Sequence, residues 1–259
     1  MAIVKPFFCI RPEYSVVSKV AALPYDVYNR KEALKEVADN PLSFLNIDRA
    51  ETQFGEEVDI YDERVYQKAK ELLDARIKDK TFLEEKEECY YLYQLTMDAR
   101  SQTGIVACSS IEDYKNGIIK KHENTREEKE LDRIRHVEVT NAHTGPIFLA
   151  YRRNETLAEL MEEVMKEEPL YDFVSDDGIN HKVWRIGDKQ KIMAIEDAFQ
   201  KVPVTYIADG HHRAASAAKV GMRRIKAQEE SGNPVTGKEP YQYFLSVLFP
   251  EDQLMIMPY

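Results

Sequence analysis

The sequence predicts an α+β protein in which mixed sheets are flanked by helices. Runs of β-branched and aromatic residues at strand length, such as 89–97 and 103–109, stand among segments of helical periodicity such as 61–80. Apolar residues make up 43% of the 259 residues, which is ordinary for a globular protein that buries a sizeable core. No apolar run approaches the length of a membrane span, so no membrane partner is expected.

The first part of the chain is expected to contribute both strands and helices. Residues 30–39 form a short amphipathic segment that Asn40-Pro41 would stop, and residues 61–80 carry apolar side chains three and four apart. Clusters of β-branched and aromatic residues predict strands at residues 7–10, 43–47, 89–97 and 103–109. The last two strands are expected to pair as a hairpin across residues 98–102.

The second part begins with a helix whose start is marked by Thr125 and Glu128. These two residues have the spacing of a capping box, and the helix is expected to run to about Asn141. Further helices are expected at residues 156–167, at 189–201 and after Gly210, and further strands at residues 147–151, 170–174, 181–186, 202–207, 243–249 and 254–257.

The net charge and the cysteine content indicate the cellular compartment of the protein and the partners that it can bind. The net charge of −10 gives a field that repels nucleic acid, so specific binding of duplex DNA is not expected. Three separated cysteines (Cys9, Cys89 and Cys108) lack metal-ligand spacing and suit a reducing cytosol, and the first residues lack a signal peptide's apolar core. A cytoplasmic protein is therefore expected. The apolar end at Pro258-Tyr259 favours a piece of a longer chain that lacks a C-terminal portion.

The most informative stretch is Asp209-Gly210-His211-His212-Arg213, which lies between a predicted strand and a predicted helix. Gly210 lets the backbone approach a ligand, and the unpaired N–H groups at a helix start attract an anion. His212 and Arg213 would lie at the same positive end, so a polyphosphate is the expected ligand. The simpler interpretation is that Asp209 caps the helix, the glycine shapes a turn and the histidines lie on the surface. Neither the two histidines nor the arginine is needed to begin a helix, which favours the binding site.

A second helix start carries a similar set of side chains. Lys121-His122-Glu123 comes shortly before Thr125, and the simpler interpretation is a charged loop followed by an ordinary cap. Both helix starts, however, hold a histidine, a cation and a nearby acid. If both helix starts faced one cleft, they would bind a polyphosphate between them and leave a carboxylate near the reacting oxygen.

Nearly the whole chain resembles an uncharacterised bacterial family, the domain of unknown function numbered 1015, whose members are longer and are often labelled ParB-like. The matching segments are Arg11-Pro12, Pro24-Tyr25-Asp26-Val27, Asn40-Pro41 with Ser43-Phe44-Leu45, Lys121-His122-Glu123 with Thr125, Gly145-Pro146-Ile147-Phe148 and Ala208-Asp209-Gly210-His211-His212-Arg213. The last segment is the most specific of them.

The Gly-His-His-Arg turn is also similar to the nucleotide-binding turn of the ParB/sulfiredoxin superfamily, in which archaeal free-serine kinases carry a similar Asp-Gly-His-His-Arg. This resemblance implies a ParB/sulfiredoxin-like nucleotide-binding domain and nucleotide-dependent phosphoryl chemistry. His211 stands where sulfiredoxins have their cysteine, so sulfiredoxin activity is not expected. No helix-turn-helix follows the turn, so the usual DNA-binding module of ParB is missing.

These observations together predict a nucleotide-dependent phosphotransferase, namely a small-molecule kinase acting on a free amino acid such as serine, or a phosphohydrolase. ATP or ADP would be bound by Gly210, His211, His212, Arg213, Lys121 and Thr125. Asp209 would hold Mg²⁺ or orient the acceptor, and Glu123 would be the general base, with His122 as the alternative.

The alternative function is a ParB-like nucleotide-binding partition or regulatory protein without small-molecule chemistry. In either case the chain is interpreted as one continuous unit over residues 1–259. Residues 1–110 and 111–259 are the candidate subdivisions, and the second of them would carry the nucleotide site.

Overall fold

The computed structural model describes residues 1–255, and a mixed sheet is its main feature. Within these residues nine strands form one sheet, in which two of the strand pairs are parallel and the others are antiparallel. The predicted α+β class with a mixed sheet and flanking helices is therefore confirmed. In spatial order the strands are β6 (Ile119–Lys120), β10 (Thr205–Asp209), β7 (Ile147–Tyr151), β11 (Tyr243–Pro250), β5 (Arg100–Ser110), β4 (Tyr90–Met97), β9 (Asn180–Ile186) and β8 (Tyr171–Val174), with β1 (Val4–Lys5) added on β5.

One edge of this sheet determines where the site lies. The edge strand β6 runs parallel to β10, with Thr205 opposite Ile119 and Tyr206 opposite Lys120. The carboxyl ends of parallel strands meet at the same side of a sheet. The segments that follow Lys120 and Asp209 therefore leave the sheet next to each other, although they are far apart in the chain.

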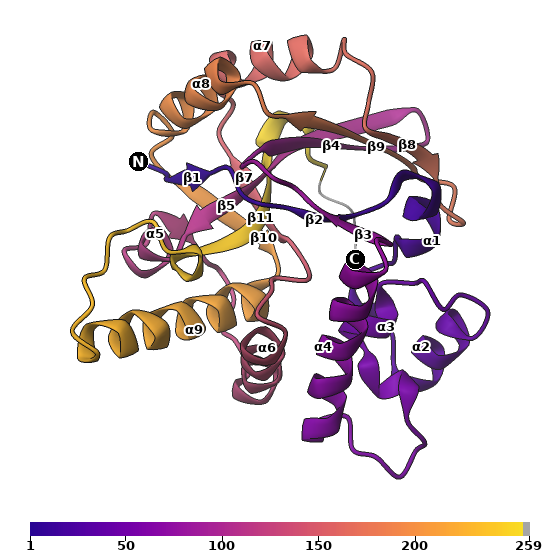
Figure 1. Ribbon diagram of the computed structural model, residues 1–259. Coiled ribbons are helices and arrows are strands. Elements are labelled where there is room, and N and C mark those ends of the chain that lie inside the picture. Colours follow the sequence, from indigo (N-terminus) through magenta and orange to yellow (C-terminus); the bar gives the residue numbers. More distant parts are fainter. Residues whose placement is uncertain (256–259) are drawn as a thin grey trace.

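Helices cover both faces of the sheet. Figure 1 shows α7 (Glu155–Val164) and α8 (Lys189–Phe199) on one side, and α6 (Glu127–Thr140) and α9 (His211–Glu230) on the other, with α5 (Ile111–Lys115) beside them. The main core lies between these layers and buries side chains such as Tyr90, Leu149, Phe199 and Phe244 almost completely. Removing this apolar surface from water is the chief stabilising contribution to the fold.

A second, mostly helical group packs beside α6 (Figure 1). It has its own apolar core, which includes Ile47, Val65 and Phe82. Tyr66 of this group donates a hydrogen bond from its hydroxyl to Asp132 of α6, with 2.8 Å between the two oxygens. The group comprises α1 (Val17–Val20), α2 (Arg30–Val37), α3 (Leu45–Asp48), α4 (Glu63–Lys78) and the two-stranded sheet of β2 (Ile10–Pro12) and β3 (Phe82–Glu84). Short 3-10 turns lie at η1 (Tyr14–Val16), η2 (Tyr25–Val27), η3 (Ala50–Gln53), η4 (Pro240–Gln242) and η5 (Glu251–Gln253).

The long periodic segments have the structures predicted for them. Residues 30–39 and 61–80 contain α2 and α4, which begin at caps formed by Asn29 and Asp62. The hairpin of β4 and β5 is also present, but its turn is shorter than predicted. Asp98 and Ala99 close it alone with φ values of 49° and 64°, the left-handed backbone of a tight two-residue turn.

The strand predicted at residues 43–47 is wrong, because this segment forms the helix α3. Leu45, Asn46 and Ile47 are all buried, and an apolar run buried on every side has no periodicity that separates strand from helix. Hydrogen bonds from a side chain of α3 close the turn that precedes this helix. The Asn46 amide donates to the carbonyls of Asn40 and Ser43, at 3.2 Å each.

The predicted terminal strands also differ from the structure. Residues 7–10 do not form one strand, since Phe7 makes a single bridge to Cys89 and pairing resumes only at β2, which starts with Ile10. Of the strand predicted at 254–257, Leu254 and Met255 are in no strand, and residues 256–257 lie outside the described residues.

At Gly221, helix α9 packs very closely against α5 and against the segment before β11. A methyl group added to this glycine would lie 2.2 Å from the Ile111 side chain and 2.3 Å from the carbonyl oxygen of Tyr241. Real Cβ atoms do not come so near, so only glycine allows this packing. The contact fixes α9 against α5 and against the segment before β11.

Candidate functional site

The candidate site begins where β10 passes into α9 through Gly210. This residue has φ of 91°, a left-handed backbone that suits glycine, and it is the N-cap of a helix that starts at His211. The helix predicted to follow Gly210 is therefore present, and Ala214 already donates its N–H to the Gly210 carbonyl at 2.9 Å.

The first turn of α9 presents backbone donors without acceptors. The N–H groups of His211, His212 and Arg213 have no hydrogen-bond acceptor within residues 1–255, and Asp209 does not cap the helix. A helix of 20 residues carries a partial positive charge at this end. The turn therefore has the donors and the potential of an anion site.

The Arg213 side chain is held by the protein rather than left extended. Its Nη2 lies 2.6 Å from Oδ2 of Asp209, and its Nη1 donates to the Pro146 carbonyl at 2.6 Å. It also covers Gly210, where an added Cβ would lie 3.1 Å from the arginine Nε. Asp209 keeps 64% of its side chain exposed, so this carboxylate remains accessible beside the anion site.

The structure brings the second predicted segment next to this turn. The rings of His122 and His211 meet edge to face with 4.4 Å between centroids. Oε2 of Glu123 lies 3.5 Å from Nδ1 of His211. On the same side, the Arg126 N–H donates to Nε2 of His212 at 3.1 Å. Parallel pairing of β6 and β10 thus joins two charged stretches that are far apart in the sequence.

His211 is a buried residue, although the sequence favoured a phosphate-binding side chain at this position. Its side chain is only 5% exposed, and its Nε2 has no hydrogen-bond partner among the described residues. Burial lowers the pKa of His211, and the neighbouring His122 lowers it further, whereas the carboxylate of Glu123 raises it. A neutral imidazole at neutral pH follows, and its Nδ1 lies beside the carboxylate of Glu123.

Thr125 and Lys121 both have contacts within the protein. The capping box of Thr125 with Glu128 is wrong, since α6 begins at Glu127 with Arg126 as its N-cap and without a side-chain cap. The Thr125 hydroxyl donates instead to the carboxylate of the buried Glu130. Lys121 places its ammonium over the ring of Tyr114, 5.1 Å from the ring centre, and remains exposed.

Glu130 links α6 to α9. Burial would raise its pKa, but hydrogen bonds from Lys219 and Thr125 outweigh this effect and lower it. Ser216 of α9 adds a hydrogen bond to the Glu130 carbonyl at 3.0 Å. These bonds fix the beginning of α6 against the first turns of α9.

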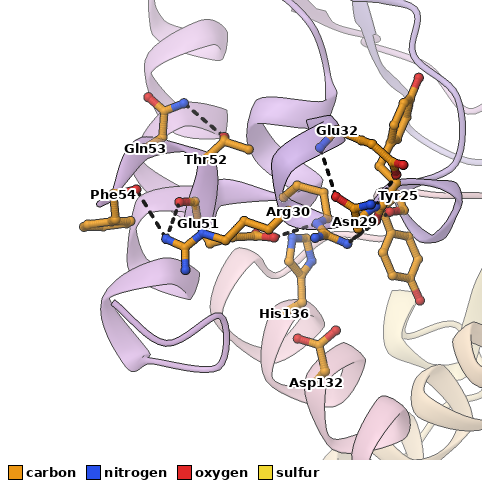
Figure 2. Close-up of polar contacts among 12 residues, drawn as sticks. Tyr25, Asn29, Arg30, Glu32, Glu51, Thr52, Gln53, Phe54, Asp132 and His136 are labelled. Carbon is orange, nitrogen blue, oxygen red and sulfur yellow. Dashed lines mark hydrogen bonds and ion pairs between the residues drawn. The ribbon is translucent and has the colours of Figure 1, made fainter. Parts of the chain in front are cut away.

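The sequence reasoning missed a polar cavity of about 150 Å³ between α6, α4 and the segment of α3 and η3. Its lining includes Tyr25, Asp48, Glu51, Asp132, Arg133 and His136. Figure 2 shows Asp132 and His136 on α6, with His136 pointing towards Arg30 of α2 and Glu51 of η3. One signal was present, because Asp132, Arg133 and His136 are spaced so that they share one face of a helix.

Arg30 holds the wall of this cavity that carries Glu51 (Figure 2). Its guanidinium donates to the carbonyls of Val58 and Gly55, at 2.7 Å each, and more weakly to those of Glu51 and Phe54. Four backbone acceptors on one cation fix the loop after η3. Arg30 therefore supports the cavity without lining it.

A larger cavity, of about 800 Å³, has a mainly apolar lining that includes Phe7, Phe8, Phe44 and Phe82. Among the described residues, none from the α9 turn lines it. The part of the chain that the structure describes contains no group of three or more His, Cys, Asp or Glu residues that would hold a metal ion.

Comparison with known proteins gives one match. The model of a family described as "Protein of unknown function (DUF1015)" matches residues 4–259. No curated protein and no solved structure matches the chain. In residues 1–255, no helix combines the length and the apolar character that a membrane span requires.

Proposed function

Because the chain belongs to the DUF1015 family, whose description names no activity, we propose its function from the site: nucleotide-dependent phosphoryl transfer to a small molecule. The observation that carries this proposal is the parallel β6–β10 pair, which brings His122 and Glu123 next to His211 in the first turn of α9. Phosphoryl transfer needs positive charge on the phosphates and a base near the acceptor. The first turn of α9 supplies the positive charge, and the segment with His122 and Glu123 supplies the base.

The phosphates of ATP or ADP would be bound by the N–H groups of His211, His212 and Arg213. Because Nε2 of His212 accepts a hydrogen bond, its proton lies on Nδ1, which can donate to a phosphate oxygen. The exposed carboxylate of Asp209 fits a role as Mg²⁺ ligand, since Mg²⁺ is commonly held by one or two carboxylates together with substrate phosphates.

Glu123 is the proposed general base, with His122 as the alternative. The acceptor hydroxyl oxygen bonds to the terminal phosphorus while the bond from phosphorus to the leaving nucleotide breaks, and the hydroxyl proton passes to Glu123. With water as the acceptor, the same arrangement gives a phosphohydrolase. The Glu123 side chain is 58% exposed, so an acceptor can reach it.

The acceptor class rests on the similarity of the Asp-Gly-His-His-Arg turn to that of archaeal free-serine kinases. This similarity supports a free amino acid such as serine, on a ParB/sulfiredoxin-like nucleotide domain. Incubation with radiolabelled nucleotide and a pool of small hydroxyl compounds tests the proposal. A labelled organic product indicates a kinase, labelled inorganic phosphate indicates a hydrolase, and binding without either product indicates the alternative regulatory or partition protein.

Arg213→Ala is expected to weaken nucleotide binding by about 1.5–3 kcal/mol, the range for hydrogen bonds to charged groups. The change removes a cation from the anion site and releases Asp209 and Gly210 from their contact with the guanidinium. Calorimetric titration with ATP and ADP measures the effect. Arg223→Ala is the matched control, because Arg223 lies further along α9 and pairs with Glu138 on the surface. Equal affinities of wild type and Arg213→Ala would contradict the assignment.

We also expect no sequence-specific binding of duplex DNA. The net charge of −10 opposes the phosphate contacts that supply most non-specific affinity. Gel-shift titration of the whole chain at physiological salt, against a random-sequence duplex library, is the measurement. Selection of one sequence with nanomolar affinity would overturn this expectation and favour the partition protein.

A further inference from the structure

The larger, mainly apolar cavity lies between the main sheet and the mostly helical group beside α6. Its volume of about 800 Å³ falls within the range of about 300–1,000 Å³ that small-molecule sites have. Cys108 of β5 and Leu245 of β11 line one side, and these two residues are register partners in the sheet. Leu73 of α4 and Phe82 of β3 line the other side. The cavity is therefore a gap between two separately packed parts of the fold, and each part contributes apolar side chains to it.

Aromatic rings are the largest side chains of this lining. Phe44 and Phe82 stack on each other with 6.0 Å between ring centroids, and Phe7 and Tyr243 line the cavity from other segments. Phe8 also lines it and is 62% exposed, so one large ring is left in contact with water. Rings pack favourably against other rings, either offset or edge to face. The lining therefore favours a ligand that is itself a ring system.

The buried ions of the lining already have partners within the protein. Nζ of Lys5 lies 2.9 Å from Oε1 of Glu196, and both residues line the cavity. Nε of Arg11 lies 2.6 Å from Oε1 of Glu85. Because each cation is held by a carboxylate, neither is left to attract an anionic ligand.

The other titratable groups of the described lining add no net charge. Glu88 and Lys238 have opposite charges, and both are exposed. Burial lowers the pKa of His143 to about 4, so its imidazole is neutral at neutral pH. Burial raises the pKa of the Cys9 and Cys108 thiols to about 12, so both stay protonated. An ionised ligand would lose its hydration in this cavity without gaining a counter-ion, which favours an uncharged one.

We propose that this cavity binds an uncharged aromatic molecule, which fills the space between β11 and the helical group and packs against the phenylalanine rings. The proposal does not depend on phosphoryl transfer at the α9 turn, since none of the described residues of that turn lines the cavity. An acyl chain is the rival apolar ligand, but it lacks the ring faces and edges that this lining would contact.

The test is fluorescence titration of the whole chain with N-phenylnaphthylamine, an uncharged aromatic dye whose emission rises in apolar surroundings. Anilinonaphthalene sulfonate is the matched ligand, because it has the same rings and adds one negative charge. We expect saturable binding of one uncharged dye per chain and at least tenfold weaker binding of the sulfonate. No saturable binding, or equal binding of both dyes, would overturn the proposal. Displacement of the bound dye by an equimolar amount of decanol would assign the cavity to an acyl chain and overturn it as well.

Two variants place the dye in the cavity. Leu245→Trp puts an indole into the space and should lower the affinity for the uncharged dye at least tenfold. Phe8→Ala removes one exposed ring of the lining and should lower it about two- to tenfold, as expected for the loss of one aromatic contact. Tyr206→Ala is the matched control, because Tyr206 is an exposed aromatic residue of β10 that does not line the cavity. It should leave the affinity unchanged.

Full affinity in a folded Leu245→Trp protein would contradict the proposal. If circular dichroism shows that this variant does not fold, Phe8→Ala decides the assignment alone, because replacing an exposed side chain leaves the core intact. Full affinity in Phe8→Ala would then place the dye elsewhere and overturn the proposal. The proposed phosphoryl transfer is decided separately by the labelled products, so either proposal can fail without the other.

Discussion

Glu123→Gln is expected to lower the rate of phosphoryl transfer by about 10²–10⁴-fold, the usual contribution of a general base. The amide keeps the size and position of the carboxylate next to His211, but it does not accept a proton at neutral pH. Nucleotide affinity should be unchanged, because the phosphates are held by the first turn of α9. Single-turnover transfer of labelled phosphate, together with nucleotide titration, measures the two effects separately.

Glu127→Gln is the matched control, because Glu127 is an exposed acid in the first turn of α6. It should leave both transfer and affinity unchanged. A full rate in Glu123→Gln combined with a reduced rate in His122→Asn would transfer the role of base to His122. A full rate in both variants would remove this segment from the chemistry altogether.

Gly221→Ala is expected to destabilise the protein by about 3 kcal/mol, at the upper end of what one excess methyl group costs in a packed core. The new Cβ would collide with Ile111 and with the carbonyl oxygen of Tyr241, and a backbone oxygen cannot turn away as a side chain does. For a chain of this size, we expect Tm to fall by about 6–12 °C. Thermal unfolding followed by circular dichroism gives the change.

Met222→Ala is the control for this prediction, since Met222 lies one position further on α9 and is 41% exposed. Its effect on Tm should be small. A Gly221→Ala protein as stable as the wild type would show that α9 can move away from α5 and η4 at little cost. The close approach at Gly221 would then not hold α9 in place.

The sequence predicted the fold well where periodicity was long or turn residues were distinct. The segments 61–80 and 147–151 show this, because each has one buried face that sets a repeat of helix or strand. It failed at 43–47, where every side chain of α3 but the last is buried and no repeat exists.

Part of the site was visible in the sequence and part was not. Gly210 at a strand-to-helix turn is a local signal, and the structure gives it the left-handed backbone that a tight turn needs. The burial of His211 and the ties from Arg213 to Asp209 and Pro146 depend on distant segments, so no local pattern predicts them. The cavity around Arg133 was hidden for the same reason, because its walls come from three separate parts of the chain.

The helix α6 connects the α9 turn with the polar cavity. Its N-cap Arg126 bonds to His212 and its Glu130 bonds to Lys219, while one turn later Arg133 faces the cavity. A small rotation or shift of this rigid element would change the geometry of both places at once. Binding of a nucleotide at the α9 turn and binding of a molecule in the cavity should therefore be thermodynamically coupled, and each must change the affinity of the other by the same factor. We expect this coupling to weaken when Glu130 no longer ties α6 to α9.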